Sequence, residues 1–184
     1  MSMHNEEILN ALIALVRTGL EKIAATSSGT SPQRLADKKI HTETAVADLR
    51  IGRVLVKRAK QLLGDVSILV EETAPTSVNL RNYDVVIDPI DCTRGFLHNL
   101  PGTGCAAVYV KNGEPIASAI GQIASTSARD AFLPDIVYGG FVKDRWQAWA
   151  VTGAQPVPCR TSPRTAPEDF LVSVEMDAFD TARE

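Results

Sequence analysis

Apolar residues near the start of the chain recur every three or four positions, which is the spacing of one face of an α-helix. This pattern predicts a long amphipathic helix over residues 5–26, and the polar stretch TSSGTSPQ ends it. The same spacing predicts a second helix over residues 44–63, with Gly64 as its stop. The side chains expected to be buried on this second helix are Leu49, Val54, Leu55, Val56, Ala59, Leu62 and Leu63.

After Gly64 the apolar positions change to the short runs that are typical of β-strands. Two of these runs, VSILVEE and YDVVIDP, end in acidic residues, so their strands are expected to deliver carboxylates to one place. Asn112-Gly113 lies between two apolar runs and predicts a tight hairpin, because both residues tolerate positive φ. The proline-rich residues 156–169 are expected to be an exposed connection. Further strands are expected over residues 135–142, 146–151 and 170–174.

This order of elements predicts an α+β fold, in which two long N-terminal helices pack on a largely antiparallel sheet. The chain has 184 residues, of which 45% are hydrophobic and 22% are charged. A chain of this size and composition is expected to form one domain, over residues 1–184.

Charge and cysteine content narrow the classes of function. The formal net charge of -3 predicts no nucleic-acid polymer as a partner. Arg17 interrupts the apolar run near the N-terminus before it reaches the length of a membrane span, so neither a membrane helix nor a signal peptide is expected. The three cysteines contain no CxxC pair and leave one residue unpaired in any disulfide scheme, which predicts a cytoplasmic protein.

The segment DVVIDPIDCTRGF, residues 84–96, places two acids at the end of a predicted strand. Asp88 and Asp91 are three positions apart, so they converge only if the chain turns between them, which Pro89 favours. Asp91 is then expected to cap a helix that begins near Cys92, where free N–H groups suit a phosphate oxygen. Two acids that face an anion site imply a bridging cation.

Oxygen ligands on this loop favour Mg²⁺ over zinc, and Glu71 and Glu72 at the preceding strand end are candidates to complete the cluster. A simpler interpretation makes Asp-Pro an ordinary turn and Asp91 only a helix cap. Two other phosphatase chemistries fit less well. One needs acids two positions apart on a strand, and the other needs arginine six positions after Cys92, where the chain has His98.

With VEET at residues 70–73 and DPIDCTRGF at residues 88–96, the chain resembles the inositol monophosphatase-like phosphatases, which are Mg²⁺-dependent and lithium-sensitive. The resemblance implies that Glu71 and Asp88 bind one Mg²⁺ together with the backbone carbonyl of Ile90. It also implies that Asp88 and Asp91 hold a second ion. Mn²⁺ is the expected substitute metal, and Li⁺ is the expected inhibitor.

The resemblance further implies that the Thr93 hydroxyl, paired with Asp48, orients and deprotonates the attacking water. Asp91 and the backbone N–H groups of Cys92 and Thr93 would bind the substrate phosphate, while Glu72 would support the metal ligands from behind. Cys92 stands where the family has glycine, and Val70 replaces a second glycine before the acid pair.

The function implied is that of a Mg²⁺-dependent phosphomonoesterase, which uses metal-activated water to hydrolyse a small phosphorylated polyol, sugar or nucleotide. The alternative is a catalytically silent metal- or phosphate-binding or assembly module with the same fold. The resemblance covers only the N-terminal part of the family's length, so the chain is expected to lack most of a C-terminal α/β region. One face of the sheet is therefore expected to be covered by a second copy, as in a dimer, or by that missing region.

Overall fold

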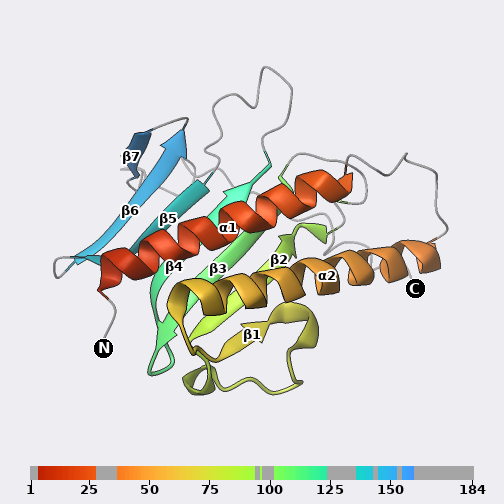
Figure 1. Ribbon diagram of the computed structural model, residues 1–184, viewed down its shortest axis with the longest axis horizontal. Helices are drawn as coiled ribbons and strands as arrows, with labels where there is room; N and C mark the ends of the chain where they lie inside the picture. The colour runs from red at the N-terminus through yellow and green to blue at the C-terminus, as the bar shows by residue number, and fades with distance from the viewer. Residues whose placement is uncertain are drawn as a thin grey trace, which may run out of the picture.

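The computed structural model describes residues 4–27, 37–93, 96, 102–123, 136–142, 145–152 and 155–159, and of residues 27, 37–45 and 152 it describes the backbone only. These residues form two long helices that lie against one sheet (Figure 1). The elements are α1 (Asn5–Ser27), α2 (Asp37–Leu63), β1 (Ile68–Val70), η1 (Glu71–Thr73), η2 (Leu80–Asn82), β2 (Val85–Asp91), β3 (Gly104–Lys111), β4 (Glu114–Gln122), β5 (Ile136–Val142), β6 (Arg145–Thr152) and β7 (Gln155–Cys159).

Within the described residues the sheet has seven strands, and their order across the sheet is their order along the chain. β1 and β2 run parallel, and each later strand is antiparallel to the one before it. Only two residues separate β3 from β4, β5 from β6 and β6 from β7 along the chain, and such short connections favour antiparallel neighbours. The architecture confirms the predicted α+β class with a largely antiparallel sheet.

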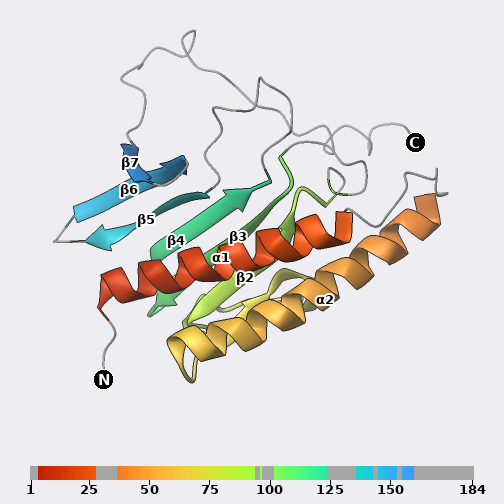
Figure 2. The ribbon, with the colours of Figure 1, turned by 45° about the horizontal axis from the view of Figure 1, so that its top comes forward.

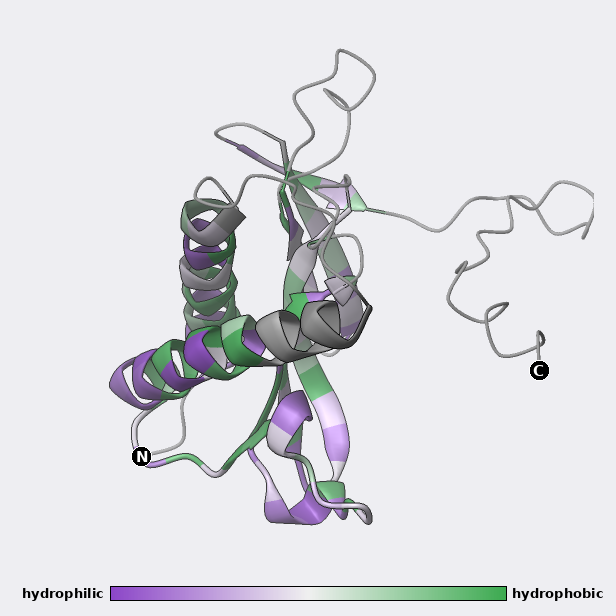
Figure 3. Cartoon of the chain, turned by 90° about the vertical axis from the view of Figure 1, so that its right-hand side faces the viewer, coloured by the Kyte–Doolittle hydropathy of each residue, from purple (hydrophilic) through white to green (hydrophobic). Residues whose placement is uncertain are grey.

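Both helices pack on the same face of the sheet, which Figure 2 shows from above the helices. α1 crosses β3, β4 and β5, whereas α2 lies over β2. In Figure 3, hydrophilic and hydrophobic bands alternate along both helices, as expected for helices with one wet side. None of the helices in the described part of the chain is both long and apolar enough to cross a membrane.

The core lies between the helices and this face of the sheet. Its largest fully buried side chains include Leu12, Leu15, Ile23, Leu55, Ile87, Ile90 and Ile136. Cys105 in β3 is fully buried and also belongs to the core. Gly19 of α1 lies directly against it, since a Cβ on Gly19 would be only 2.5 Å from the Cys105 Sγ atom. The glycine therefore lets α1 approach β3 closely.

The predicted helices are confirmed, with two corrections. α2 begins at Asp37, seven residues before the expected start, and two of its predicted core residues, Leu49 and Val54, are 37% and 38% exposed. They lie beside the stripe that faces the sheet rather than on it. The buried positions of that stripe are Asp48, Ile51, Gly52, Leu55, Ala59 and Leu63.

The predicted hairpin is confirmed at Asn112-Gly113, where φ is 57° and 86°. Two consecutive positive φ angles match the hand of turn that joins twisted antiparallel strands, and here they join β3 to β4. The prediction that residues 156–169 form a connection was wrong at its start. Pro156 and Pro158 belong to β7, which tolerates proline because it lies at the edge of the sheet that the described residues form. The strand expected over residues 170–174 lies outside the described residues.

Candidate active site

Two acids meet because β1 and β2 are parallel and end at the same edge of the sheet. Val70 pairs with Ile87, so the next residues, Glu71 and Asp88, are neighbours. The chain then turns sharply through η1, which brings Glu72 to the same place. Carboxylate oxygens of Glu71, Glu72 and Asp88 lie within 4.8 Å of one another.

α2 adds a fourth acid, Asp48, which lies on the buried side of the helix and is only 4% exposed. One turn later, Gly52 allows the helix to lie close to the strand ends. A Cβ at this position would be 3.2 Å from Val70 Cγ1 and 3.4 Å from Pro89 Cγ. In the sequence, Asp48 falls on the helical stripe whose other members are apolar. A charged residue at such a position is rarely there only to face water, and this signalled that Asp48 has a functional role.

Burial and nearby negative charge make three of these acids, Asp48, Glu72 and Asp88, hard to ionise. Burial raises the pKa of Asp48 from an ordinary 3.8 to about 7, and repulsion from Glu72, Asp88 and Glu71 adds to the shift. The pKa of Asp88 is also raised to about 7, and burial is the largest cause. Repulsion from Glu71, Asp91 and Glu72 and a hydrogen bond with Glu71 raise it further. The pKa of Glu72 is raised by burial too, although a hydrogen bond with its own backbone opposes the shift.

Three buried oxygens of this cluster have no hydrogen-bond partner among the residues that the structure describes: Asp48 Oδ1, Glu72 Oε2 and Asp88 Oδ1. A buried polar atom without a partner costs about 1–3 kcal/mol, and more if it is charged. Two ligands on opposite sides of a Mg²⁺ ion would be about 4.2 Å apart, since each bond is about 2.1 Å long. The carboxylate oxygens of Glu71, Glu72 and Asp88 lie within 4.8 Å of one another, and they are the ligand type that a hard cation prefers, so the residues fit a divalent metal ion.

The loop after β2 carries the other predicted residues. Strand register shifts between Asp88 and Asp91, so the strand turns there, as the proline suggested. The Thr93 hydroxyl donates to the Ile90 carbonyl at 3.1 Å, and the Phe96 N–H donates to the Cys92 carbonyl at 3.0 Å. The residue that caps the N-terminus of a helix accepts the first hydrogen bond of that helix with its carbonyl. Cys92 is therefore the cap residue, and the prediction that Asp91 would be the cap was wrong by one position.

Cys92 is exposed and has a φ of 63°, the left-handed conformation that glycine adopts without strain. The backbone therefore keeps the shape that a glycine would favour, although a side chain is present. For a residue other than glycine this conformation costs roughly 1–2 kcal/mol.

The structure thus brings Asp48, Glu71, Glu72 and Asp88 into one cluster. Asp91 lies close enough to raise the pKa of Asp88, and it is half-buried at the end of β2. Sequence reasoning placed Glu72 behind the ligands, whereas its carboxylate belongs to the same group as those of Glu71 and Asp88. The signal for this was its position directly after Glu71, where a tight turn can bring both side chains to one point.

A family model described as the inositol monophosphatase family matches residues 4–177. The chain therefore belongs to the inositol monophosphatase family. Among curated proteins no sequence gives a significant match.

Solved structures show the same fold at low sequence identity. SuhB of Mycobacterium tuberculosis has a TM-score of 0.61 and 16% identity, and the match covers 88% of this chain and 54% of that one. Inositol monophosphatase II of Staphylococcus aureus MSSA476 has a TM-score of 0.56 and 16% identity, covering 82% and 50%. CysQ of Bacteroides thetaiotaomicron has a TM-score of 0.54 and 16% identity, covering 84% and 53%. The chain thus spans about half the length of these proteins.

Proposed function

We propose that this chain supplies the metal- and phosphate-binding part of a Mg²⁺-dependent phosphomonoesterase that acts on a small phosphorylated polyol, sugar or nucleotide. The observation that carries the proposal is the set of unpartnered buried oxygens on Asp48, Glu72 and Asp88. A divalent cation is the simplest partner that would remove their repulsion. Membership of the inositol monophosphatase family supports a phosphate ester as the substrate.

In this proposal Glu71, Asp88 and the backbone carbonyl of Ile90 would hold one Mg²⁺, and Asp88 and Asp91 would hold a second. The carboxylate of Glu72, which lies in the same group as those of Glu71 and Asp88, would be a further ligand. When bound, Mg²⁺ would lower the pKa of a water molecule and stabilise charge on the ester oxygens. Mn²⁺ as a substitute and Li⁺ as an inhibitor are further expectations.

The loop after β2 would receive the substrate. The backbone N–H groups of Cys92 and Thr93, together with Asp91, are proposed to surround the phosphate. Asp48 is the proposed base, because its buried carboxylate keeps one oxygen, Oδ1, without a hydrogen-bond partner among the described residues and so open to a proton. The Thr93 hydroxyl, held now by its bond to the Ile90 carbonyl, would orient the water for Asp48.

We also propose a cytoplasmic location, which the cysteines support. Cys92, Cys105 and Cys159 are all free thiols, and free thiols are kept reduced in that compartment.

Calorimetric titration with Mg²⁺ and Mn²⁺ at pH 8 tests the site. Asp88→Asn is expected to abolish measurable binding, because it removes the carboxylate that both proposed sites share. Asp65→Asn is the matched control, since Asp65 is an exposed acid in the loop between α2 and β1. An isotherm that Asp88→Asn leaves unchanged contradicts the assignment.

Hydrolysis of a panel of phosphomonoesters, with Mg²⁺ or with EDTA, tests the activity. Inositol monophosphate is a suitable first substrate, because one solved structure with this fold is an inositol monophosphatase II with inositol monophosphate bound. Weak Mg²⁺-dependent phosphate release that Asp88→Asn abolishes is the expected result, because this chain supplies only Asp88 and Asp91 to the proposed second metal site. Metal binding without hydrolysis of any ester would instead support the silent binding or assembly module.

A further inference from the structure

A cavity of about 430 Å³ lies at the end of the sheet opposite the carboxylate cluster. It is bounded by the start of α1, the residues just after α2, the residues just before β2, and the turn between β3 and β4. In Figure 1 the last turn of α2 and the β3–β4 turn lie near each other at the lower left. Leu63 lines the cavity and Asp48 belongs to the cluster, and their separation on α2 corresponds to about 22 Å of helix. The cavity is therefore distinct from the candidate active site.

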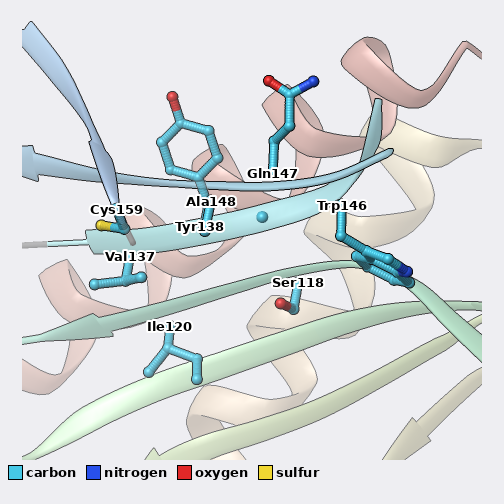
Figure 4. A pocket seen from close by; sticks show the side chains of 10 residues that line it. Ser118, Ile120, Val137, Tyr138, Trp146, Gln147, Ala148 and Cys159 are labelled. Atoms are coloured by element: carbon cyan, nitrogen blue, oxygen red, sulfur yellow. The ribbon is translucent and has the colours of Figure 1, made fainter. Parts of the chain in front are cut away.

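Ionic and hydrogen-bonding side chains line this cavity: Asp65, Arg81, Tyr83, Asp84, Tyr109 and Lys111. A larger hollow of about 530 Å³ on the sheet face away from the helices is different, because none of its lining residues is charged. Figure 4 shows Ile120, Val137 and Trp146 around that hollow. A site for a small molecule needs a few polar groups that fix the ligand in one orientation. The polar cavity has such groups with both signs of charge.

Two cationic side chains flank the β3–β4 turn at one side of the cavity. Arg81 lies against this turn, because a Cβ on Gly113 would be only 2.9 Å from Arg81 Cγ. Lys111 is the last residue of β3, directly before the turn. Among the described residues, neither cationic side chain forms a hydrogen bond or an ion pair. Both charges are therefore available to an anionic group of a ligand.

Two acids line another side of the cavity, next to the segment that leads into β1. Asp84 is held in place there, since its Oδ2 atom accepts hydrogen bonds from the Ser67 N–H at 2.8 Å and from the Ser67 hydroxyl at 2.6 Å. Burial and the charge of Asp84 raise the pKa of Tyr109, so its phenol stays protonated as a donor. Asp65 is exposed and has no hydrogen-bond or ion-pair partner among the described residues. This side of the cavity therefore attracts a cationic group.

We propose that this cavity binds a small zwitterion of the amino-acid class. Its carboxylate would lie beside Arg81 and Lys111, and its ammonium group would lie beside Asp65 and Asp84. The two cations and two carboxylates of the cavity sum to zero charge. A ligand that carries only negative charge would be repelled by the acids, and one that carries only positive charge would be repelled by the bases.

Thermal unfolding of the 184-residue chain in the presence of each of the standard amino acids tests the proposal. At least one of them is expected to raise the unfolding temperature, because a ligand that binds only the folded state stabilises it. Calorimetry with that amino acid should show at least about tenfold weaker affinity in Arg81→Gln, Lys111→Gln and Asp65→Asn, since each removes one charge-assisted contact. Lys57→Gln is the matched control, because Lys57 is an exposed cation on α2 that does not line the cavity.

Two derivatives of the same amino acid separate the two ends of the ligand. The methyl ester lacks the carboxylate charge and the N-acetyl form lacks the ammonium charge, so each is expected to bind at least about tenfold more weakly than the parent. An N-acetyl form that binds as tightly as the parent would show that the cavity takes a plain anion, and would overturn the proposal.

Two other results would also overturn it. One is the absence of binding by every amino acid at millimolar concentration, and the other is binding that survives both Arg81→Gln and Asp65→Asn. The proposed metal site is tested separately. Asp88→Asn should leave the amino-acid affinity unchanged, and Arg81→Gln should leave the Mg²⁺ affinity unchanged, so failure of either proposal is distinguished from failure of the other.

Discussion

Replacing Asp48 with asparagine is expected to stabilise the metal-free protein by an amount that depends on pH. The Asp48 carboxylate is 4% exposed, and its pKa is about 7 in the folded protein against an ordinary 3.8. Folding therefore opposes ionisation of this group. Each pKa unit corresponds to about 1.4 kcal/mol, so the difference of about three units sets an upper limit of about 4 kcal/mol at pH 8.

The direction in which this penalty changes with pH follows from the two pKa values of Asp48, since the pKa is higher in the folded protein than in the unfolded chain. Above pH 7 Asp48 is ionised in both states, so the full penalty falls on the folded state. Between pH 7 and pH 3.8 the folded state retains the proton that the unfolded chain releases, and the penalty shrinks. Near pH 4 it is almost gone. The amide introduced by Asp48→Asn carries no charge at any pH, and we expect a gain of about 2–4 kcal/mol at pH 8 and under about 1 kcal/mol at about pH 4.

Urea unfolding in EDTA, followed by far-ultraviolet circular dichroism at both pH values, measures this difference. Asp65→Asn, at an exposed position, should change the free energy of unfolding by less than about 0.5 kcal/mol at either pH. Added Mg²⁺ should reduce the gain, because a bound cation offsets the repulsion from Glu71, Glu72 and Asp88. A gain that is equal at both pH values, or a loss at pH 8, would refute the reasoning.

Two further substitutions test the surroundings of the cluster. Cys92→Gly should raise the free energy of unfolding by about 1 kcal/mol and tighten binding of inorganic phosphate, because glycine adopts a φ of 63° without strain. Equal or weaker phosphate affinity in calorimetry would contradict this account of the loop. Gly52→Leu should weaken Mg²⁺ binding at least tenfold. The Cβ of the new side chain would already lie 3.2 Å from Val70 and 3.4 Å from Pro89, so the larger residue would force α2 and Asp48 away from the strand ends. Unchanged Mg²⁺ affinity in a folded Gly52→Leu protein would show that α2 does not position the site.

Local patterns in the sequence were sufficient for the elements that depend on neighbouring residues. The two helices follow from apolar spacing, and the hairpin follows from the tolerance of Asn112-Gly113 for positive φ. The acids at the ends of two strands were visible for the same reason, because strand and turn signals are short. The family motifs then connected these acids to metal and phosphate chemistry.

β7 shows where local patterns misled. Proline usually excludes a central strand, and the pattern therefore predicted a loop. Only the strand order of the described residues reveals that this strand lies at the edge of their sheet. Leu49 and Val54 show the same limit. Apolar residues were expected to be buried, but which side of α2 faces the sheet depends on packing against β2, and these two side chains lie off that side.

The sequence by itself determined which residues could do chemistry, and the tertiary structure decided which of them meet. Glu71 and Asp88 are neighbours because Val70 pairs with Ile87 in parallel, a register set by the whole sheet. Asp48 joins them because Gly52 lets a helix approach the strand ends. Burial then raises the pKa of Asp48 and of Asp88 to about 7, a shift that depends on long-range packing rather than on the order of residues along the chain.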